Sequence, residues 1–286
     1  SSPMANVIHV QVYHHKGAVE KKPQFEIFPN EKPHVEITED DQVAKFTSGD
    51  LSVQIQKGKQ WSIEYLGHDK HLTHSGSNAM GFMDKSNGDR HMLDKLSLSV
   101  GECVYGMGER FAAFVKNGQK VDIWNEDGGT GSELAYKNAP FYLTNRGYGV
   151  FVNHPEKVSF EVASENVKCV QFSVPGEKLD YYIIYGPSPK DILDRYTALT
   201  GRPALQPAWS FGLWLSTSFT TEYDQKSVIR MVDDMAKYNL PVHIFHFDCF
   251  WMKAFRWINL QWDEVRFPEP EKMLAELKTR GLHVSL

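Results

Sequence analysis

The sequence predicts a β-sandwich over residues 1–200, followed over residues 201–286 by the first strands and helices of a (β/α)8 barrel. Three observations favour this fold class. Short strand-like segments recur between turn residues in the first 200 positions, and a Gly- and Pro-containing stretch interrupts the pattern near residue 201. Beyond it, strand-like and helix-like segments alternate, which is typical of parallel α/β folds.

The N-terminal segments have the composition of antiparallel strands. Runs rich in β-branched and aromatic residues are separated by turn pairs such as Asn87-Gly88, Asn117-Gly118 and Pro175-Gly176. Many short strands of this kind predict two packed sheets. The expected strands are residues 7–13, 34–37, 51–56, 61–66, 96–100, 141–144, 149–153, 158–162, 170–174 and 180–185.

A helix and a domain boundary follow the last of these strands. Residues 187–200 have helical spacing of apolar positions and begin with proline, which favours a helix start. The sequences Gly201-Arg202-Pro203 and Gln206-Pro207 then break the pattern. We therefore expect an N-terminal sandwich domain over 1–200 and a barrel segment over 201–286.

The barrel segment is expected to alternate strand, helix, strand, helix and strand. Asp224 is a plausible N-cap for a helix whose apolar positions lie at i, i+3, i+4 and i+7, and Pro270 and Gly281 suit the start and end of a second helix. The expected strands are residues 209–215, 242–248 and 282–286. Three parallel strands cannot close an eight-stranded barrel, and an apolar strand at the end would leave an unpaired edge, so we expect this chain to be a piece of a longer protein.

Composition excludes several classes of function. Among 286 residues, 41% are hydrophobic and 23% charged, the net charge is -5, and no basic run suggests a nucleic-acid partner. No apolar run approaches the roughly 18 residues of a membrane span. The three cysteines, Cys103, Cys169 and Cys249, are far apart, which argues against a disulfide framework and a zinc site. His68, His71 and His74 are expected to lie in a polar loop as surface histidines, so no metal is expected, and no cofactor is expected either.

The N-terminus lacks the charged and apolar regions of a signal peptide, although Ser1-Ser2-Pro3 equally suits a cut end. The compartment therefore stays open, with the cytoplasm slightly favoured.

The strand expected to end at Asp248 carries the best candidate site. A carboxylate, a thiol and two large aromatics follow one another as Asp248-Cys249-Phe250-Trp251. Because the C-terminal ends of parallel strands form the active face of a barrel, polar residues there are candidates for binding or catalysis. The alternative is that Asp248 only caps the next turn.

With these segments placed, the sequence resembles glycoside hydrolase family 31, and most closely its α-xylosidases. The resemblance extends over essentially the whole chain. It is carried by the stretches Val104-Tyr105-Gly106-Met107-Gly108-Glu109-Arg110-Phe111, Trp124-Asn125-Glu126-Asp127-Gly128-Gly129-Thr130, Tyr136-Lys137-Asn138-Ala139-Pro140-Phe141-Tyr142, Thr144-Asn145-Arg146-Gly147-Tyr148-Gly149-Val150 and Pro207-Ala208-Trp209-Ser210-Phe211-Gly212-Leu213-Trp214, and by the segment 246–253.

The resemblance implies an N-terminal β-sandwich, a TIM barrel and a retaining exo-α-glycosidase. Such enzymes use one aspartate as nucleophile and another as acid and base. In this family both aspartates lie on later barrel segments, so the resemblance assigns neither role to a residue of this chain, and the 286 residues alone are expected to be inactive.

The resemblance also assigns a sugar pocket to the strand end. Asp248 corresponds to a carboxylate that holds hydroxyls of the sugar being released. Family α-glucosidases commonly have Asp-Ile-Asp here, whereas this chain has Asp248-Cys249-Phe250. A phenyl ring in place of the second carboxylate removes a partner for the hydroxymethyl group of glucose, which xylose lacks, and this favours an α-xyloside.

Three further residues are candidates for substrate binding. Phe219 resembles an aromatic that lines the pocket, with a core position as the less favoured alternative, and Trp251 lies just beyond the strand end. Asp127 lies in a sandwich loop that, in the family, reaches the barrel mouth, although acidic residues before two glycines also suit an ordinary turn. Cys249 is expected to line the pocket without reacting.

Three other functions stay open. The first is an α-glucosidase of the same family, and the second is a non-catalytic sugar-binding sandwich module. The third is a structural subunit whose missing barrel strands are supplied by a partner chain. The expected partners are α-xylosides or xyloglucan-type oligosaccharides, with no nucleic acid and no membrane. A homo-oligomer is left open by the resemblance.

Overall fold

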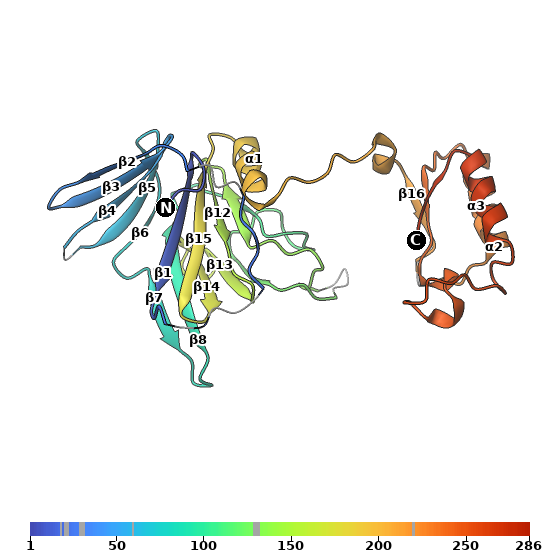
Figure 1. Cartoon of the computed structure of the whole chain (residues 1–286), viewed down its shortest axis with the longest axis horizontal. Helices are drawn as coiled ribbons and strands as arrows, with labels where there is room; N and C mark the ends of the chain where they lie inside the picture. Colours follow the sequence, from blue (N-terminus) through green and yellow to red (C-terminus); the bar gives the residue numbers. More distant parts are fainter. Residues whose placement is uncertain (18, 20–22, 29–31, 59, 128–131, 219–220) are drawn as a thin grey trace. The chain divides into compact units, whose positions relative to one another are not determined.

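The computed structural model describes residues 1–286 except 18, 20–22, 29–31, 59, 128–131 and 219–220. Contacts within the chain divide it into two compact units, Ser1–Pro203 and Ala204–Leu286 (Figure 1). We call them the N-terminal unit and the C-terminal unit.

The described residues of the N-terminal unit form three antiparallel sheets of five strands each. The first sheet contains β1 (Val7–Tyr13), β15 (Lys178–Tyr185), β12 (Tyr148–Val152), β11 (Phe141–Thr144) and β9 (Val104–Gly106). The second contains β10 (Gln119–Ile123), β13 (Val158–Val162), β14 (Cys169–Pro175), β8 (Arg90–Ser97) and β7 (Gly81–Asp84). The third contains β2 (Val35–Glu39), β3 (Val43–Ser48), β4 (Leu51–Gln56), β5 (Ser62–Gly67) and β6 (Lys70–Ser75).

One hydrophobic core joins the three sheets. The strands bury alternate side chains, as β13 and β14 do, so that residues such as Phe160, Phe172 and Val104 are fully buried between the sheets. At the centre lies a carboxylate, Asp94 of β8, which accepts hydrogen bonds from the hydroxyls of Ser75 (2.6 Å) and Tyr181 (2.8 Å). These three side chains belong to three different sheets, so the network fixes the sheets against one another.

A helix covers part of the outer face of the first sheet. Helix α1 (Pro189–Thr200) begins with Pro189 after the N-cap Ser188, whose hydroxyl and Asp191 form a capping box. The helix buries Ile192 and Leu199 against apolar residues of the sheet, namely Val7, Phe141, Phe151, Tyr182 and Ile184. The first sheet is therefore apolar on both faces over this half of its strands.

The C-terminal unit is the beginning of a parallel α/β fold. Strands β16 (Trp214–Ser216), β17 (Ile244–His246) and β18 (His283–Ser285) form a parallel sheet in that order. Helices α2 (Gln225–Lys237) and α3 (Pro270–Thr279) follow the first two strands and bury Val228, Val232, Met273 and Leu277. The remaining elements are the short 3-10 helices η1 (Ala208–Phe211), η2 (Cys249–Trp251) and η3 (Lys253–Phe255).

The expected N-cap of α2 and the glycine after α3 are confirmed. Asp224 forms a capping box with Ser227, and Gly281 has φ 82° directly after the last turn of α3. The sandwich and the start of a barrel are also as expected.

Three expectations need correction. The sandwich prediction contained two sheets, whereas strands β2 to β6 form a third. The strand expected over 209–215 begins instead as η1, because the hydroxyl of Ser210 donates to the carbonyl of Pro207 (2.7 Å) and Gly212 closes the turn onto Trp209. His71 and His74 lie in strand β6 and not in a loop.

Candidate functional site

The parallel register brings the C-terminal ends of three strands together. Ser216 of β16, His246 of β17 and Ser285 of β18 are direct neighbours across the sheet, and His246 Nδ1 lies 3.2 Å from the hydroxyl of Ser285. Asp248 follows His246 after one buried residue, Phe247. The carboxylate therefore stands at the edge of the sheet where a barrel of this kind places its active face.

Asp248 starts the turn that carries the next three candidates. Its carboxylate accepts a hydrogen bond from the backbone N–H of Cys249 (2.6 Å), so that Asp248 is the N-cap of η2. The capping alternative from the sequence is thus realised, but one N–H occupies only part of a carboxylate's acceptor capacity. The half-buried side chain keeps acceptor positions for a ligand.

Tyr223 fixes this turn from a neighbouring element. Its hydroxyl donates to the backbone carbonyl of Asp248, and its ring is 2% exposed. Burial, followed by the charge of Asp248, raises the pKa of the Tyr223 hydroxyl, so the group stays a donor at neutral pH. Tyr223 directly precedes the N-cap of α2, and Val228 is the fourth residue after that cap. Both side chains belong to the same hydrophobic core, so they form a hydrophobic staple.

The Phe250 side chain is half-buried between an aromatic ring and a cation. Its ring meets that of Tyr223 edge to face, with centroids 6.0 Å apart, and the guanidinium of Arg266 lies 5.3 Å from its centroid. Arg266 also pairs with Glu222 at 3.3 Å. These contacts present an aromatic surface, without an acceptor, two residues after Asp248.

Trp251 and Cys249 are placed differently from Asp248. Trp251 is 6% exposed, and its ring packs on Trp262 with centroids 5.1 Å apart in the core of the C-terminal unit. Burial and the hydrogen bond and charge of Asp248 raise the pKa of the Cys249 thiol, so it is protonated at neutral pH and is no activated nucleophile. Phe219 lies outside the described residues.

Asp127 belongs to the N-terminal unit, where side-chain hydrogen bonds hold its loop. The Asp127 side chain is exposed and accepts a hydrogen bond from the hydroxyl of Tyr136. Asn138 donates to the carbonyls of Trp124 (2.8 Å) and Ala135 (2.7 Å), closing the base of the loop.

Arg110 strengthens this base. Its guanidinium donates to the backbone carbonyls of Asp122 (2.7 Å) and Glu133 (3.0 Å) and to the side chain of Asn138. These hydrogen bonds therefore join the chain segments before and after Asp127 at the base of the loop.

The residues that sequence reasoning missed are the supporting ones. Tyr223 and Arg266 contact Phe250, yet only Tyr223 had a local signal, namely its position before a helix N-cap. Arg110 and Asn138 lie in stretches that carry the family resemblance, but their contacts join segments far apart in sequence.

Among the described residues, no group of three His, Cys, Asp or Glu side chains is placed to hold a metal ion. The three cysteines form no disulfide. Within the described part of the chain, no helix has the length and apolar character needed to cross a membrane.

Two domain families match the sequence of this chain. The glycosyl hydrolase 31 N-terminal galactose mutarotase-like domain matches residues 1–161, and the glycosyl hydrolases family 31 TIM-barrel domain matches residues 203–286. Both are parts of glycoside hydrolases, which is the class that the fold and the strand-end site suggest. The chain belongs to glycosyl hydrolase family 31.

Relatives of this chain include proteins named as alpha-xylosidases. The chain is 48% identical over 99% of its length to the alpha-xylosidase XylQ of Lactiplantibacillus pentosus, and 46% identical over its whole length to an alpha-xylosidase of Emericella nidulans. It spans 37% and 39% of the length of these two proteins. An alpha-glucosidase of Saccharolobus solfataricus is 29% identical over 77% of the chain.

Solved structures agree with the fold. A GH31 dextranase of Flavobacterium johnsoniae superimposes with a TM-score of 0.83 at 20% identity, over 98% of this chain and 34% of its own. A GH31 alpha-xylosidase from a soil metagenome superimposes with a TM-score of 0.76 at 18% identity, over 98% of this chain and 43% of its own.

Proposed function

We propose that the complete protein is an α-xylosidase that releases α-linked xylose from the non-reducing end of xyloglucan-type oligosaccharides. The observation that carries this proposal is the aromatic surface of Phe250 two residues after Asp248, at the C-terminal end of β17. The two α-xylosidase relatives, at 48% and 46% identity, support the same substrate.

Asp248 would hold hydroxyl groups of the xylose. Its carboxylate accepts a hydrogen bond from the N–H of Cys249 and is hydrogen-bonded to the thiol of the same residue, which leaves acceptor capacity for sugar hydroxyls. Hydrogen bonds to a charged acceptor are stronger than those between neutral groups, so a carboxylate orients a neutral sugar well. The Tyr223 hydroxyl holds the backbone of Asp248 in place for this contact.

Phe250 would discriminate against glucose. A hexose brings a hydroxymethyl group that needs space and a hydrogen-bond partner, and the Phe250 ring supplies neither. Tyr223 and Arg266 contact this ring on the protein side, which limits how far it can turn away. Unpaired polar groups in a pocket are strong discriminators, commonly stronger than a missing apolar contact.

The chemistry would follow the retaining mechanism, in which one aspartate forms a glycosyl-enzyme intermediate and a second acts as acid and then base. We place both aspartates in parts of the complete protein outside residues 1–286. Asp248, Phe250 and, from its own unit, Asp127 are proposed to bind substrate and not to react.

The test compares two aryl substrates on the complete protein. Phe250→Asp should lower kcat/KM for an aryl α-xyloside about 10-fold or more and raise that for the aryl α-glucoside, because it restores an acceptor for the hydroxymethyl group. Phe250→Leu is the matched control, since it keeps an apolar side chain and should keep the preference for xyloside. An unchanged ratio of the two rates in Phe250→Asp would refute the role of Phe250.

An α-glucosidase is the second candidate, favoured only by relatives such as the Saccharolobus solfataricus enzyme at 29% identity. It predicts that the unaltered protein hydrolyses the aryl α-glucoside faster than the aryl α-xyloside. The same pair of substrates therefore separates the two functions before any residue is changed.

A further inference from the structure

The outer face of the first sheet changes character along its strands. Antiparallel pairing places His9 opposite Tyr182, Gln11 opposite Asp180 and Tyr13 opposite Lys178. Side chains alternate along a strand, so these six lie on one face, while Ile8 of β1 points into the core between the sheets. Helix α1 covers the apolar half of this face and ends before the polar half.

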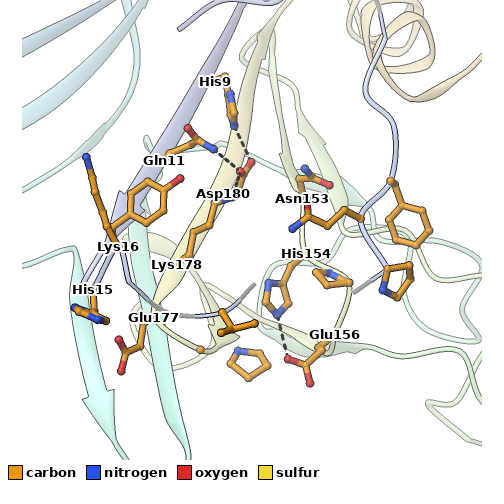
Figure 2. A pocket seen from close by; sticks show the side chains of 18 of the residues that line it. His9, Gln11, His15, Lys16, Asn153, His154, Glu156, Glu177, Lys178 and Asp180 are labelled. Carbon is orange, nitrogen blue, oxygen red and sulfur yellow. Dashed lines mark hydrogen bonds and ion pairs between the residues drawn. The ribbon is translucent and has the colours of Figure 1, made fainter. Parts of the chain in front are cut away.

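The polar half is the floor of a cavity of about 640 Å³. Its wall includes Asn153, His154 and Glu156, which follow strand β12, and Lys16, which follows β1 (Figure 2). The volume lies within the range of about 300–1,000 Å³ that is typical of small-molecule sites. This cavity belongs entirely to the N-terminal unit.

Asp180 is the centre of the cavity floor. The residue is 6% exposed, and its two carboxylate oxygens accept hydrogen bonds from His9 Nε2 (2.8 Å) and Gln11 Nε2 (2.9 Å), as Figure 2 shows. Lys178 Nζ lies 3.3 Å from the same carboxylate. The hydrogen-bonding groups at the floor are thereby held in fixed positions, which is what a binding site needs.

The polar floor has aromatic surfaces beside it. The ring of His9 stacks on that of Tyr182, with centroids 4.3 Å apart and planes at 5°. The exposed ring of Tyr13 lies 5.6 Å from Lys178 Nζ and 5.7 Å from Lys16 Nζ. Flat rings beside fixed polar groups suit a ligand that has both C–H faces and hydroxyl groups.

The charges of the lining argue for a neutral ligand. Two cations, Lys16 and Lys178, face three carboxylates, Glu156, Glu177 and Asp180. The third negative charge is neutralised from outside the lining, because Arg90 pairs with Glu177 at 2.5 Å. A site for an anion such as phosphate would show an excess of cationic donors, and a cation site would show an excess of unneutralised carboxylates.

We propose that this cavity is a saccharide-binding site, formed by the polar cross-strand pairs of β1 and β15 and taking a neutral mono- or oligosaccharide. The site requires no hydrolysis, and its failure would leave the proposed α-xylosidase function untouched. A sugar bound there makes hydrogen bonds with Gln11 and Lys178 and packs against Tyr13.

The experiment is a ligand-observed NMR titration of the chain 1–286 with methyl α-xyloside, methyl α-glucoside and methyl β-galactoside. At least one glycoside should show saturation transfer from the protein. Gln11→Leu and Lys178→Met should each weaken that binding about 3- to 10-fold, the effect of one lost hydrogen bond. Lys70→Met, an exposed lysine of strand β6 in the third sheet, is the matched control and should bind as the unaltered chain does.

A second control separates this cavity from the strand-end site. Asp248→Asn removes the proposed sugar contacts of the strand-end site, so the binding that remains in this variant reports the cavity of the other unit and should still weaken on Gln11→Leu or Lys178→Met. The proposal is overturned if no glycoside binds, if both cavity variants bind like the unaltered chain, or if Asp248→Asn removes the signal. Inorganic phosphate that displaces the sugar at a concentration below that of the sugar would also overturn the proposal, because it would show an anion site. Thermal unfolding verifies that each variant is folded. If Lys178→Met does not fold, Gln11→Leu still tests the proposal, because Gln11 is an exposed residue on an edge strand.

Discussion

Asp248 joins a structural and a proposed binding role in one side chain. One carboxylate oxygen caps the turn to Cys249, and the carbonyl of the same residue is held by Tyr223. An asparagine at this position retains an oxygen for the cap but loses the charge.

We therefore expect Asp248→Asn in the complete protein to lower kcat/KM for an aryl α-xyloside by about 10- to 100-fold, the effect of about 1.5–3 kcal/mol for a charged hydrogen bond. Steady-state kinetics measure it, and circular dichroism verifies the fold. A rate within about twofold of the unaltered protein would assign Asp248 to the turn alone.

A second carboxylate, that of Asp94, is fully buried, and this changes its pKa. Burial raises its pKa to about 6, although the hydrogen bonds from Ser75, Tyr181 and the backbone of Lys95 act in the opposite direction. The folded protein therefore holds this proton in a pH range where the unfolded chain, with a pKa near 3.8, has lost it. Stability from this group falls as the pH rises from about 4 to about 6.

The shift of about two pKa units corresponds to about 3 kcal/mol, at 1.36 kcal/mol per unit. Asp94→Asn should remove this pH dependence, so the difference in free energy of unfolding between the variant and the unaltered chain changes between pH 4 and pH 6. Urea denaturation at both pH values measures it. The exposed carboxylate variant Glu165→Gln is the control, and an equal difference at both pH values would contradict the assignment.

Among the elements, helix α2 fixes the position of Tyr223, which directly precedes its N-cap. Tyr223 in turn holds the turn at Asp248 through its hydrogen bond to the carbonyl of that residue. Its first turn is closed by Asp224, whose carboxylate accepts from the N–H of Ser227 at 2.8 Å. Nearby donors lower the pKa of Asp224, first the backbone N–H of Ser227 and then its hydroxyl, so the cap is charged at neutral pH.

Asp224→Ala should destabilise the C-terminal unit by about 1 kcal/mol, because the helix loses its N-cap. Asp224→Asn should lose much less, since an amide oxygen also caps a helix. Urea denaturation followed by tryptophan fluorescence compares the two variants. Equal losses would mean that charge, and not capping, is what α2 requires of this residue.

The elements also show what sequence can and cannot predict. Strands β1, β13 and β15 alternate or are continuously apolar, and α2 has its cap and its apolar stripe, so local patterns were sufficient. Strands β3, β6, β7, β9 and β10 were missed, and the strand expected over 96–100 overlaps only the last residues of β8 (Arg90–Ser97). Strands β7 and β9 are only four and three residues long, and β10 mixes Lys120 and Asp122 with its apolar positions. The strand-end position of Asp248 followed from the pattern, but the contacts of Phe250 with Tyr223 and Arg266 depend on tertiary packing.

At the scale of the whole chain, the two units differ in the size of their cores. The main core of the N-terminal unit contains 26 buried residues among those described, and that of the C-terminal unit contains ten. In the C-terminal unit, Leu213, which precedes β16, and Trp214, the first residue of β16, are 45% and 46% exposed. The C-terminal unit of this chain should therefore unfold first.

Five of the seven tryptophans lie in the C-terminal unit, whereas most strands lie in the N-terminal unit. In urea, we expect the fluorescence transition of the chain 1–286 to precede the transition in far-ultraviolet circular dichroism. Coincident transitions would instead show that the two units unfold together.

The pairing of β1 with β15 also sets the order in which the chain can acquire its structure. His9 and Asp180 are 171 residues apart, so β1 leaves the ribosome long before β15, its partner in the sheet, has been made. At about 5–20 residues per second, this wait is roughly 10–35 s. During that time the apolar side of β1, with Ile8, Val10 and Val12, is unprotected. Slow, non-local closure of this kind makes the nascent chain a natural client for chaperones that shield exposed strands.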